Sequence, residues 1–201
     1  MNPIINKNVK LGKDGKVCEF SIIGISPGNA NDGEFETVIG NKHMIRSHTV
    51  IYAGNVIGDN FQTGHGVSIR EHNNIGNDVS IGTKSVVEHH VTIEDGVRIH
   101  SQAFVPEFST LKKGCWIGPN VVLTNARYPK SIDAKKNLKG VVIEEGAKIG
   151  ANSTILPGIV VGKDSLVGAG SVVTKDVPAG KVVVGNPAKV INDISSLKVY
   201  L

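Results

Sequence analysis

The chain has 201 residues, a formal net charge of +4 and a charged fraction of 20%. This length allows one domain with a substantial core, and the mean hydropathy of −0.01 excludes both a membrane-embedded chain and a disordered one. The mild positive charge and an aromatic content of 4% argue against nucleic-acid binding as the main function.

The residue types favour strands and turns. Ile and Val far outnumber Leu, and the chain has 24 Gly and 8 Pro, so we expect an all-β protein. No apolar run approaches the roughly 20 residues that span a bilayer. The first residues, MNPIINKNVK, lack the apolar stretch of a signal peptide, and two cysteines cannot form a disulfide framework. We therefore expect a cytoplasmic protein without a membrane span.

Residues 1–38 lack a clear pattern. Ile5 and Leu11 are six residues apart, but the stretch KDGKVCEFSIIGISPGNANDGEFET that follows has no regular spacing. We expect these residues to form an irregular N-terminal cap, because the open end of a repeat structure must be covered.

A six-residue repeat organises residues 39–178. An aliphatic residue recurs every six positions from Ile39 to Leu123, with Thr63 as the one exception, and again from Ile143 to Val173. Gly, Asn or Asp often stands at the fourth position of the repeat, and these residues tolerate a positive φ. A short strand followed by a left-handed corner predicts a parallel β-solenoid with eighteen residues per triangular coil.

The repeat resembles the hexapeptide-repeat acyltransferases, and this resemblance implies a left-handed parallel β-helix. One long loop is expected at residues 126–140 (ARYPKSIDAKKNLKG), because twenty residues separate Leu123 from Ile143 where six would suffice. A long loop that leaves a rigid solenoid is more often functional than decorative. Residues 179–201 are expected to form a C-terminal tail.

One corner of the predicted solenoid carries titratable side chains. Residues eighteen apart stack about 4.8 Å from one another in such a fold. The third position of successive repeats reads Ala53, Glu71, His89, Glu107 and Asn125. This column ends where the long loop begins, which makes it a candidate site rather than ordinary solvated surface.

The stretch RIHSQAFVPEFSTLKKGCWIGPNVVLTN resembles the nucleotide-sugar N-acetyltransferases of this fold, which acylate a 3-amino-deoxy sugar on dTDP or UDP. The resemblance implies that His100, Glu107 and Asn125 line the sugar pocket. We expect His100 and Glu107 to approach one groove, with either as the proton acceptor. Ala126 and Arg127 follow the Asn where this group has an acid, which leaves the sugar open.

A second resemblance gives another candidate base. The segment SVVEHH is similar to related sugar acetyltransferases, in which its His is the general base. This match implies a role for His89, with Glu71 and Glu107 as neighbours that raise its pKa. His89 is the second choice.

The later coils resemble the CoA-binding region of the same family. The resemblance implies that acetyl-CoA is the acyl donor and that Ala151 and Ala169 let pantetheine lie along the coils. Lys175 and Lys189 would meet the phosphates of CoA. It also implies a homotrimer with the active site between subunits.

Three other functions are compatible with a repeat of this kind. A sugar O-acetyltransferase would need a dedicated His base, because a hydroxyl is a weaker nucleophile than an amine. A zinc site of the γ-class carbonic anhydrase type fails on spacing: His43 and His48 are five apart, but Lys7 stands where a third His is needed, so no metal is expected. A non-catalytic solenoid would show uniform corners.

Overall fold

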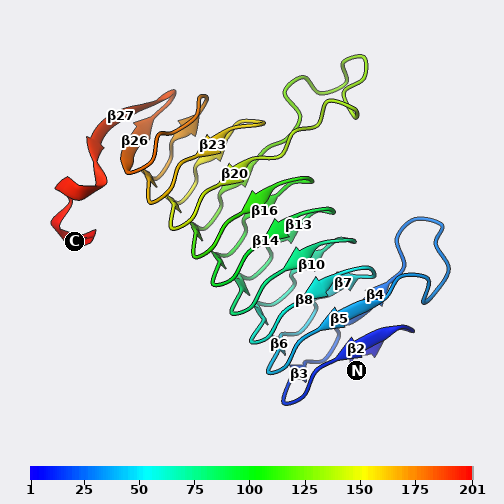
Figure 1. The fold of residues 1–201 in the computed structure, drawn as a ribbon. Coiled ribbons are helices and arrows are strands. Elements are labelled where there is room, and N and C mark those ends of the chain that lie inside the picture. The colour runs from blue at the N-terminus through cyan, green and yellow to red at the C-terminus, as the bar shows by residue number, and fades with distance from the viewer. Residues whose placement is uncertain (201) are drawn as a thin grey trace.

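The computed structural model describes residues 1–200 and is a solenoid of short parallel strands with three sides (Figure 1). Each turn adds one strand to each of three sheets. Neighbouring strands of one sheet are eighteen residues apart, as in the pairing of Ser68 with Val86. Two insertions widen this interval, each in all three sheets: one where Lys16 pairs with Met44, and a longer one where Val122 pairs with Thr154. The expected parallel β-helix is therefore confirmed.

Most strands are two residues long, which is the length that six residues per side allow. Sheet A contains β1 (Ile4–Ile5), β4 (Ile22–Ile25), β7 (Val50–Tyr52), β10 (Ser68–Ile69), β13 (Val86–Val87), β16 (Phe104–Val105), β19 (Val122–Leu123), β22 (Thr154–Ile155) and β25 (Val172–Val173). Sheet B contains β2 (Val9–Leu11), β5 (Thr37–Ile39), β8 (Val56–Ile57), β11 (Asn74–Ile75), β14 (Thr92–Ile93), β17 (Thr110–Leu111), β20 (Val142–Ile143) and β23 (Val160–Val161). Sheet C contains β3 (Lys16–Val17), β6 (Met44–Ile45), β9 (Gln62–Thr63), β12 (Ser80–Ile81), β15 (Arg98–Ile99), β18 (Trp116–Ile117), β21 (Lys148–Ile149), β24 (Leu166–Val167), β26 (Lys181–Gly185) and β27 (Ala188–Asp193).

The repeated aliphatic residues fill the interior. Ile69, Ile75 and Ile81 come from the three sheets of one coil, and none is more than 1% exposed. Thr63, the exception in the repeat, is buried too, but its hydroxyl is satisfied: Oγ1 accepts from the Arg46 backbone N–H at 3.0 Å. Burial of a hydroxyl without such a partner would be costly.

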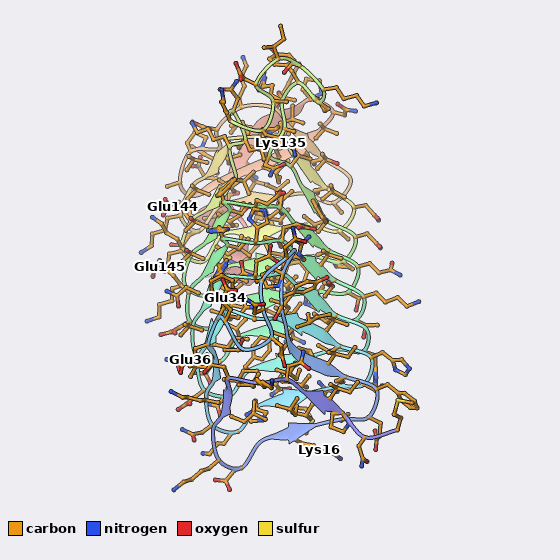
Figure 2. All side chains as sticks on the ribbon, turned by 90° about the vertical axis from the view of Figure 1, so that its right-hand side faces the viewer. Lys16, Glu34, Glu36, Lys135, Glu144 and Glu145 are labelled. Atoms are coloured by element: carbon orange, nitrogen blue, oxygen red, sulfur yellow. The ribbon has the colours of Figure 1, made fainter. Side chains whose placement is uncertain are left out.

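The chain turns at three corners, which we name after the sheets they join: A–B, B–C and C–A. The fourth position of the repeat has the left-handed conformation at Asn60, Asp78 and Asn120, as the sequence predicts. Side chains project outward from the corners and strands along the whole solenoid. Figure 2 shows Glu144 and Glu145, at the B–C corner, along one edge.

The N-terminal residues do not form the irregular cap that the sequence suggested. The strands β1 to β4 continue the three sheets, with Ile4 paired to Ile22 and Lys16 paired to Met44. Ten extra residues between Ile23 and Ile39 shift the phase of the repeat and hide it in the sequence. They belong to a loop, residues 26–36, that leaves the A–B corner.

A second loop, residues 124–141, leaves the same A–B corner between β19 and β20 (Figure 1). Its stem is closed where the backbone N–H of Lys139 donates to the carbonyl of Asn125 at 2.9 Å. Both loops lie on one side of the solenoid. The stretch of the A–B corner between them therefore has one loop at its N-terminal end and the other at its C-terminal end.

The expected C-terminal tail begins as part of sheet C. Strand β26 is parallel to β24, and β27 folds back antiparallel on β26. Two short 3₁₀ turns, η1 (Ile194–Ser196) and η2 (Lys198–Tyr200), follow the hairpin. Within residues 1–200 the structure contains no helix of the length and apolarity needed to cross a membrane.

Candidate functional site

The A–B corner between the two loops carries a continuous row of ionisable side chains, which we call the ridge. It comprises residues 70–72, 88–90 and 106–108 together with Asn125. These residues follow β10, β13, β16 and β19, so each lies one coil from the next. The solenoid thereby stacks side chains that are eighteen residues apart in sequence at about 4.8 Å intervals.

The structure brings together three of the predicted site residues on this ridge. The Asn125 amide donates from Nδ2 to Oε2 of Glu107 at 2.6 Å. The other oxygen of that carboxylate, Oε1, lies 3.8 Å from Nε2 of His89. The side chains of His89 and Glu107 are about one quarter exposed. Asn125 therefore orients Glu107, and Glu107 sets the electrostatic environment of His89.

His90 is the second partner of His89. The Nδ1 atoms of the two rings are 2.8 Å apart, so one ring donates and the other accepts. The Glu107 carboxylate favours hydrogen on Nε2 of His89, which leaves Nδ1 of His89 as the acceptor. His90 then donates from Nδ1 and keeps a lone pair on Nε2. Burial lowers the pKa of His90, and the charges of His89 and His72 lower it further.

Glu71, which was expected to hold His89, is bound to Arg70 instead. The Arg70 guanidinium donates from Nε to Oε2 of Glu71 at 2.8 Å and from Nη2 to Oε1 at 3.0 Å. Burial alone would raise the pKa of Glu71, but the hydrogen bond from Arg70 helps to bring it below the usual range. Arg70 also lies 3.5 Å from Glu88 and over the ring of Tyr52. The two hydrogen bonds from Arg70 compensate the charge of Glu71, so Glu107 is the carboxylate that acts on His89.

The ridge also carries large side chains in an unusual backbone conformation. His72, His90 and Phe108 have φ between 56° and 64°, where Gly, Asn or Asp is the common choice. Their rings contact one another in sequence along the corner, with centroids 5.4 Å apart for His72 and His90 and 5.9 Å for His90 and Phe108. Phe35 of the N-terminal loop packs on His72. Such strained positions cluster at functional sites.

His100 does not share a groove with Glu107 within one chain, contrary to the expectation. His100 follows β15 at the C–A corner, whereas Glu107 follows β16 at the A–B corner. A separation of seven residues is one side of the triangle, so the two side chains stand at successive corners. The His100 ring packs against Trp116, with centroids 4.5 Å apart. Its Nε2 is buried without a hydrogen-bond partner among residues 1–200. Burial lowers the pKa of His100, and the charge of Arg98 lowers it further.

Comparison with known proteins identifies the repeat. The family described as bacterial transferase hexapeptide (six repeats) matches residues 74–107 and 140–175. Over these residues the chain therefore carries the repeat of the hexapeptide-repeat transferases. No curated protein matches the sequence.

Solved structures match this hexapeptide-repeat protein along its length. The UDP-N-acetylglucosamine acyltransferase of Bacteroides fragilis has a TM-score of 0.65 at 17% identity, over 99% of this chain and 76% of that one. A Bacillus cereus protein assigned as an acetyltransferase has a TM-score of 0.54 at 20% identity, over 96% and 84%. The GDP-perosamine N-acetyltransferase of Caulobacter crescentus, solved with CoA, has a TM-score of 0.41 at 20% identity, over 96% and 54%. The first two matches establish the left-handed β-helix.

The residues predicted to bind CoA are divided between corners of the hexapeptide-repeat protein. Ala151 and Ala169 are adjacent at the C–A corner, where the Gly170 N–H donates to the Ala151 carbonyl at 2.8 Å. Lys175 lies at the A–B corner after β25, and Lys189 is exposed in the terminal hairpin. The C–A corner therefore carries His100 and both alanines. His100 lies two coils from Ala151 and three coils from Ala169.

Sequence reasoning missed several residues beside the predicted ones. The pairing of His90 with His89 was not predicted, because the spacing of the SVVEHH segment does not show which ring nitrogens meet. Trp116 was not assigned; it contacts His100 and lines a hollow of about 390 Å³ with Leu166.

Cys115 is buried, which raises the pKa of its thiol to about 12 and excludes it as a nucleophile. Among the described residues, no three His, Cys, Asp or Glu side chains are grouped as a metal site would require.

Proposed function

We propose that this hexapeptide-repeat protein is a CoA-dependent acyltransferase that transfers an acetyl group from acetyl-CoA to the amino group of a sugar linked to dTDP or UDP. The family match to bacterial transferases supports group transfer. The fold it shares with a UDP-N-acetylglucosamine acyltransferase is consistent with a nucleotide-linked acceptor and an acyl donor. The resemblance of residues 100–125 to amino-sugar acetyltransferases supports an amine as the nucleophile.

One observation carries this proposal: the chain of contacts from Asn125 through Glu107 and His89 to His90. The carboxylate favours the tautomer of His89 with hydrogen on Nε2, and in that tautomer the free lone pair of His90 is on its Nε2 atom. Among residues 1–200, the hydrogen bond of the His90 ring is the one at Nδ1, and no partner is found for Nε2. A neutral imidazole with a lowered pKa and an unoccupied nitrogen is suited to accept a proton near neutral pH.

The reaction needs one proton acceptor. The neutral sugar amine attacks the thioester carbonyl, the new C–N bond forms, and the C–S bond breaks to release the CoA thiolate. The nitrogen gives its extra proton to Nε2 of His90. His90 passes its Nδ1 proton to His89, so the positive charge comes to rest beside the Glu107 carboxylate. The thiolate is then protonated as CoA leaves.

Donor and acceptor groups stand on different corners, so we infer that the active site includes two copies of the chain. The alanine column proposed for pantetheine lies at the C–A corner, whereas the proposed base lies at the A–B corner. A rigid solenoid cannot bring these corners together within one chain. A cyclic homotrimer, in which the A–B corner of one copy faces the C–A corner of the next, satisfies this geometry.

O-acetylation of a sugar hydroxyl is the second candidate. The His89–His90 pair favours it, because a hydroxyl reacts only when a dedicated base removes its proton. An amine is a stronger nucleophile and depends on the base less. The two reactions therefore differ in how strongly they respond to loss of the pair.

The test is release of free thiol from acetyl-CoA in the presence of dTDP- and UDP-linked 3-amino sugars and their 3-hydroxy analogues. We expect turnover with an amine and a loss of about 10²-fold in kcat/KM when Glu107→Ala removes the carboxylate beside His89. The variant Glu145→Ala, which removes an exposed carboxylate at the B–C corner, serves as the matched control. Turnover with hydroxyl analogues alone would establish O-acetylation, and no thiol release with any acceptor would contradict the acyltransferase assignment.

A further inference from the structure

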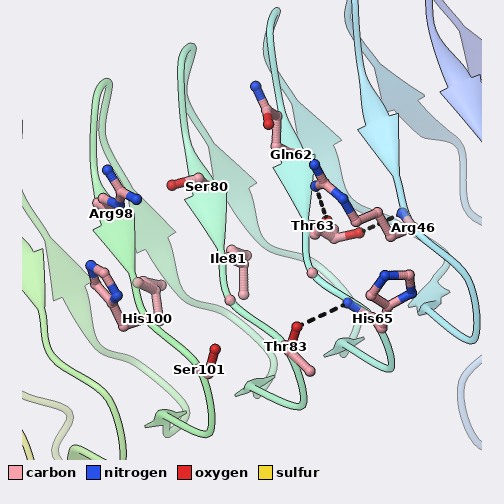
Figure 3. Close-up of a pocket in the computed structure, with 13 residues that line it drawn as sticks. Arg46, Gln62, Thr63, His65, Ser80, Ile81, Thr83, Arg98, His100 and Ser101 are labelled. Atoms are coloured by element: carbon pink, nitrogen blue, oxygen red, sulfur yellow. Dashed lines mark hydrogen bonds between the residues drawn. The ribbon is translucent and has the colours of Figure 1, made fainter.

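A hollow of about 380 Å³ lies on the outer side of sheet C, beside the C–A corner and away from the ridge (Figure 3). The strands β9, β12 and β15 form its base. Gln62, Ser80 and Arg98 stand along one rim, and His65, Thr83 and Ser101 stand along the other. Neither the ridge chemistry nor the alanine column uses it.

The repeat itself explains why this surface is hollow. The residues directly after the four successive strands of sheet C are Arg46, Gly64, Gly82 and His100. A Cβ on Gly64 would lie 2.3 Å from the Thr83 backbone nitrogen, and one on Gly82 would lie 2.4 Å from that of Ser101. Close packing of the coils thus requires glycine at both places. The floor stays bare over about 14 Å between Arg46 and His100, the height of three coil spacings.

The lining of this hollow is positive and rich in donors. Arg46 and Arg98 contribute two guanidinium groups, and none of the residues that line the hollow is Asp or Glu. Arg46 is held in place because its Nη1 donates to the Thr63 carbonyl at 2.6 Å. His65 is oriented by a hydrogen bond between its Nδ1 and the Ser47 hydroxyl at 2.9 Å. Arginine in a fixed orientation, next to hydroxyl groups, favours phosphate oxygens.

The two candidate surfaces have opposite electrostatic character. The ridge holds three carboxylates, Glu71, Glu88 and Glu107, against one guanidinium, that of Arg70, and this excess of negative charge suits an amine and disfavours a phosphate. The hollow holds two arginines and no carboxylate. The opposite charges of the ridge and the hollow would therefore orient a ligand that has an amine at one end and a diphosphate at the other.

We propose that the hollow between Arg46 and Arg98 binds the diphosphate of the acceptor, so that the sugar end is directed toward the ridge of an adjacent copy. This inference rests on the proposed nucleotide-linked acceptor. The same phosphate chemistry is present in the pyrophosphate of CoA, and the experiment separates the two sources. Arg46 and Arg98 are then binding residues, and they take no part in proton transfer.

The single tryptophan of the chain reports on this hollow, because Trp116 packs on His100 at its edge. Purified protein is titrated with UDP, dTDP, inorganic pyrophosphate and CoA while Trp116 fluorescence is followed, with isothermal titration calorimetry as the second readout. We expect Arg98→Gln and Arg46→Gln each to weaken UDP or dTDP binding about tenfold or more and to leave CoA binding unchanged. The control, Lys163→Gln, makes the same charge change in an exposed pair with Glu145 at the B–C corner.

Unchanged affinity for both nucleoside diphosphates in the two arginine variants would overturn the inference. Weakened CoA binding with unchanged nucleotide binding would also overturn it and would assign the hollow to the donor. Arginine-dependent nucleotide binding without acetyl transfer to any amine would support the inference while contradicting the proposed function. Normal acetyl transfer with an unchanged acceptor KM in Arg98→Gln would support the proposed function and contradict the inference.

Discussion

At the residue scale, the position of hydrogen on His89 decides which group accepts the proton. The nearby Glu107 carboxylate stabilises a hydrogen on Nε2, and the short contact between the Nδ1 atoms then requires His90 to donate. His89 is therefore a positioning residue in this scheme, and His90 holds the reactive lone pair. A sequence match that singles out His89 alone cannot make this distinction, because it carries no information on tautomers.

The variant His90→Asn tests that assignment. Asn tolerates the left-handed backbone at this corner, so the fold is expected to be kept. We expect kcat for the amine acceptor to fall by about 10²-fold. Since His90 acts in its neutral form and its pKa is lowered, wild-type activity should decline only as the pH falls below the ordinary histidine value of about 6.5. This acid limb should disappear in His90→Asn.

The matched control is His72→Asn, one coil away on the same corner and with the same backbone conformation. His72 contacts the His90 ring but makes no hydrogen bond to it. Glu71 and His89 also face His90, and neither residue is altered in the two variants. A pH profile with an intact acid limb in His90→Asn, or an equal loss of kcat in both variants, would refute the assigned role.

At the scale of the strand and its corner, close packing between coils dictates where glycine must stand. The variant Gly82→Ala places a Cβ 2.4 Å from a backbone nitrogen that cannot move without shifting the next coil. We expect a loss of about 2 kcal/mol in the free energy of unfolding, typical of overpacking, and a lower Tm in thermal denaturation followed by circular dichroism.

Gly114→Ala provides the comparison. Gly114 has φ of 64° and open space around it, so its substitution costs only the left-handed conformation, about 1 kcal/mol. A smaller loss for Gly82→Ala than for Gly114→Ala would show that the coils adjust more easily than the rigid packing described above.

Much of this element-level structure follows from the repeat. The six-residue spacing predicted the inward residues and the left-handed corners from Ile39 to Val173, because both depend only on local geometry. The first coils were not predicted, since the ten extra residues before Ile39 shift the repeat out of phase. The pairing of those strands rests on contacts between distant residues, which a count along the chain does not show.

At the scale of the whole molecule, the solenoid separates chemical functions onto different corners. Carboxylates and histidines gather on the A–B ridge, and arginines and small residues gather along the C–A corner. Sequence arithmetic correctly stacked Glu107 and Asn125, which are one full coil apart. It misplaced His100 relative to Glu107, because seven residues along a triangular coil cross from one corner to the next.

The central claim is that one copy supplies the ridge and another supplies the C–A corner. The most direct measurement is the thiol-release activity of two inactive variants that are co-expressed and purified as mixed oligomers. Glu107→Ala removes the ridge carboxylate, and Ala169→Trp blocks the exposed alanine column without entering the core. Each variant alone should be inactive.

Random mixing in a trimer leaves about a quarter of the sites with an intact ridge and an intact C–A corner from different copies. If the site is shared between copies, the mixture should recover about a quarter of wild-type activity. A mixture as inactive as either variant, with mixed oligomers verified by mass spectrometry, would contradict a site shared between copies.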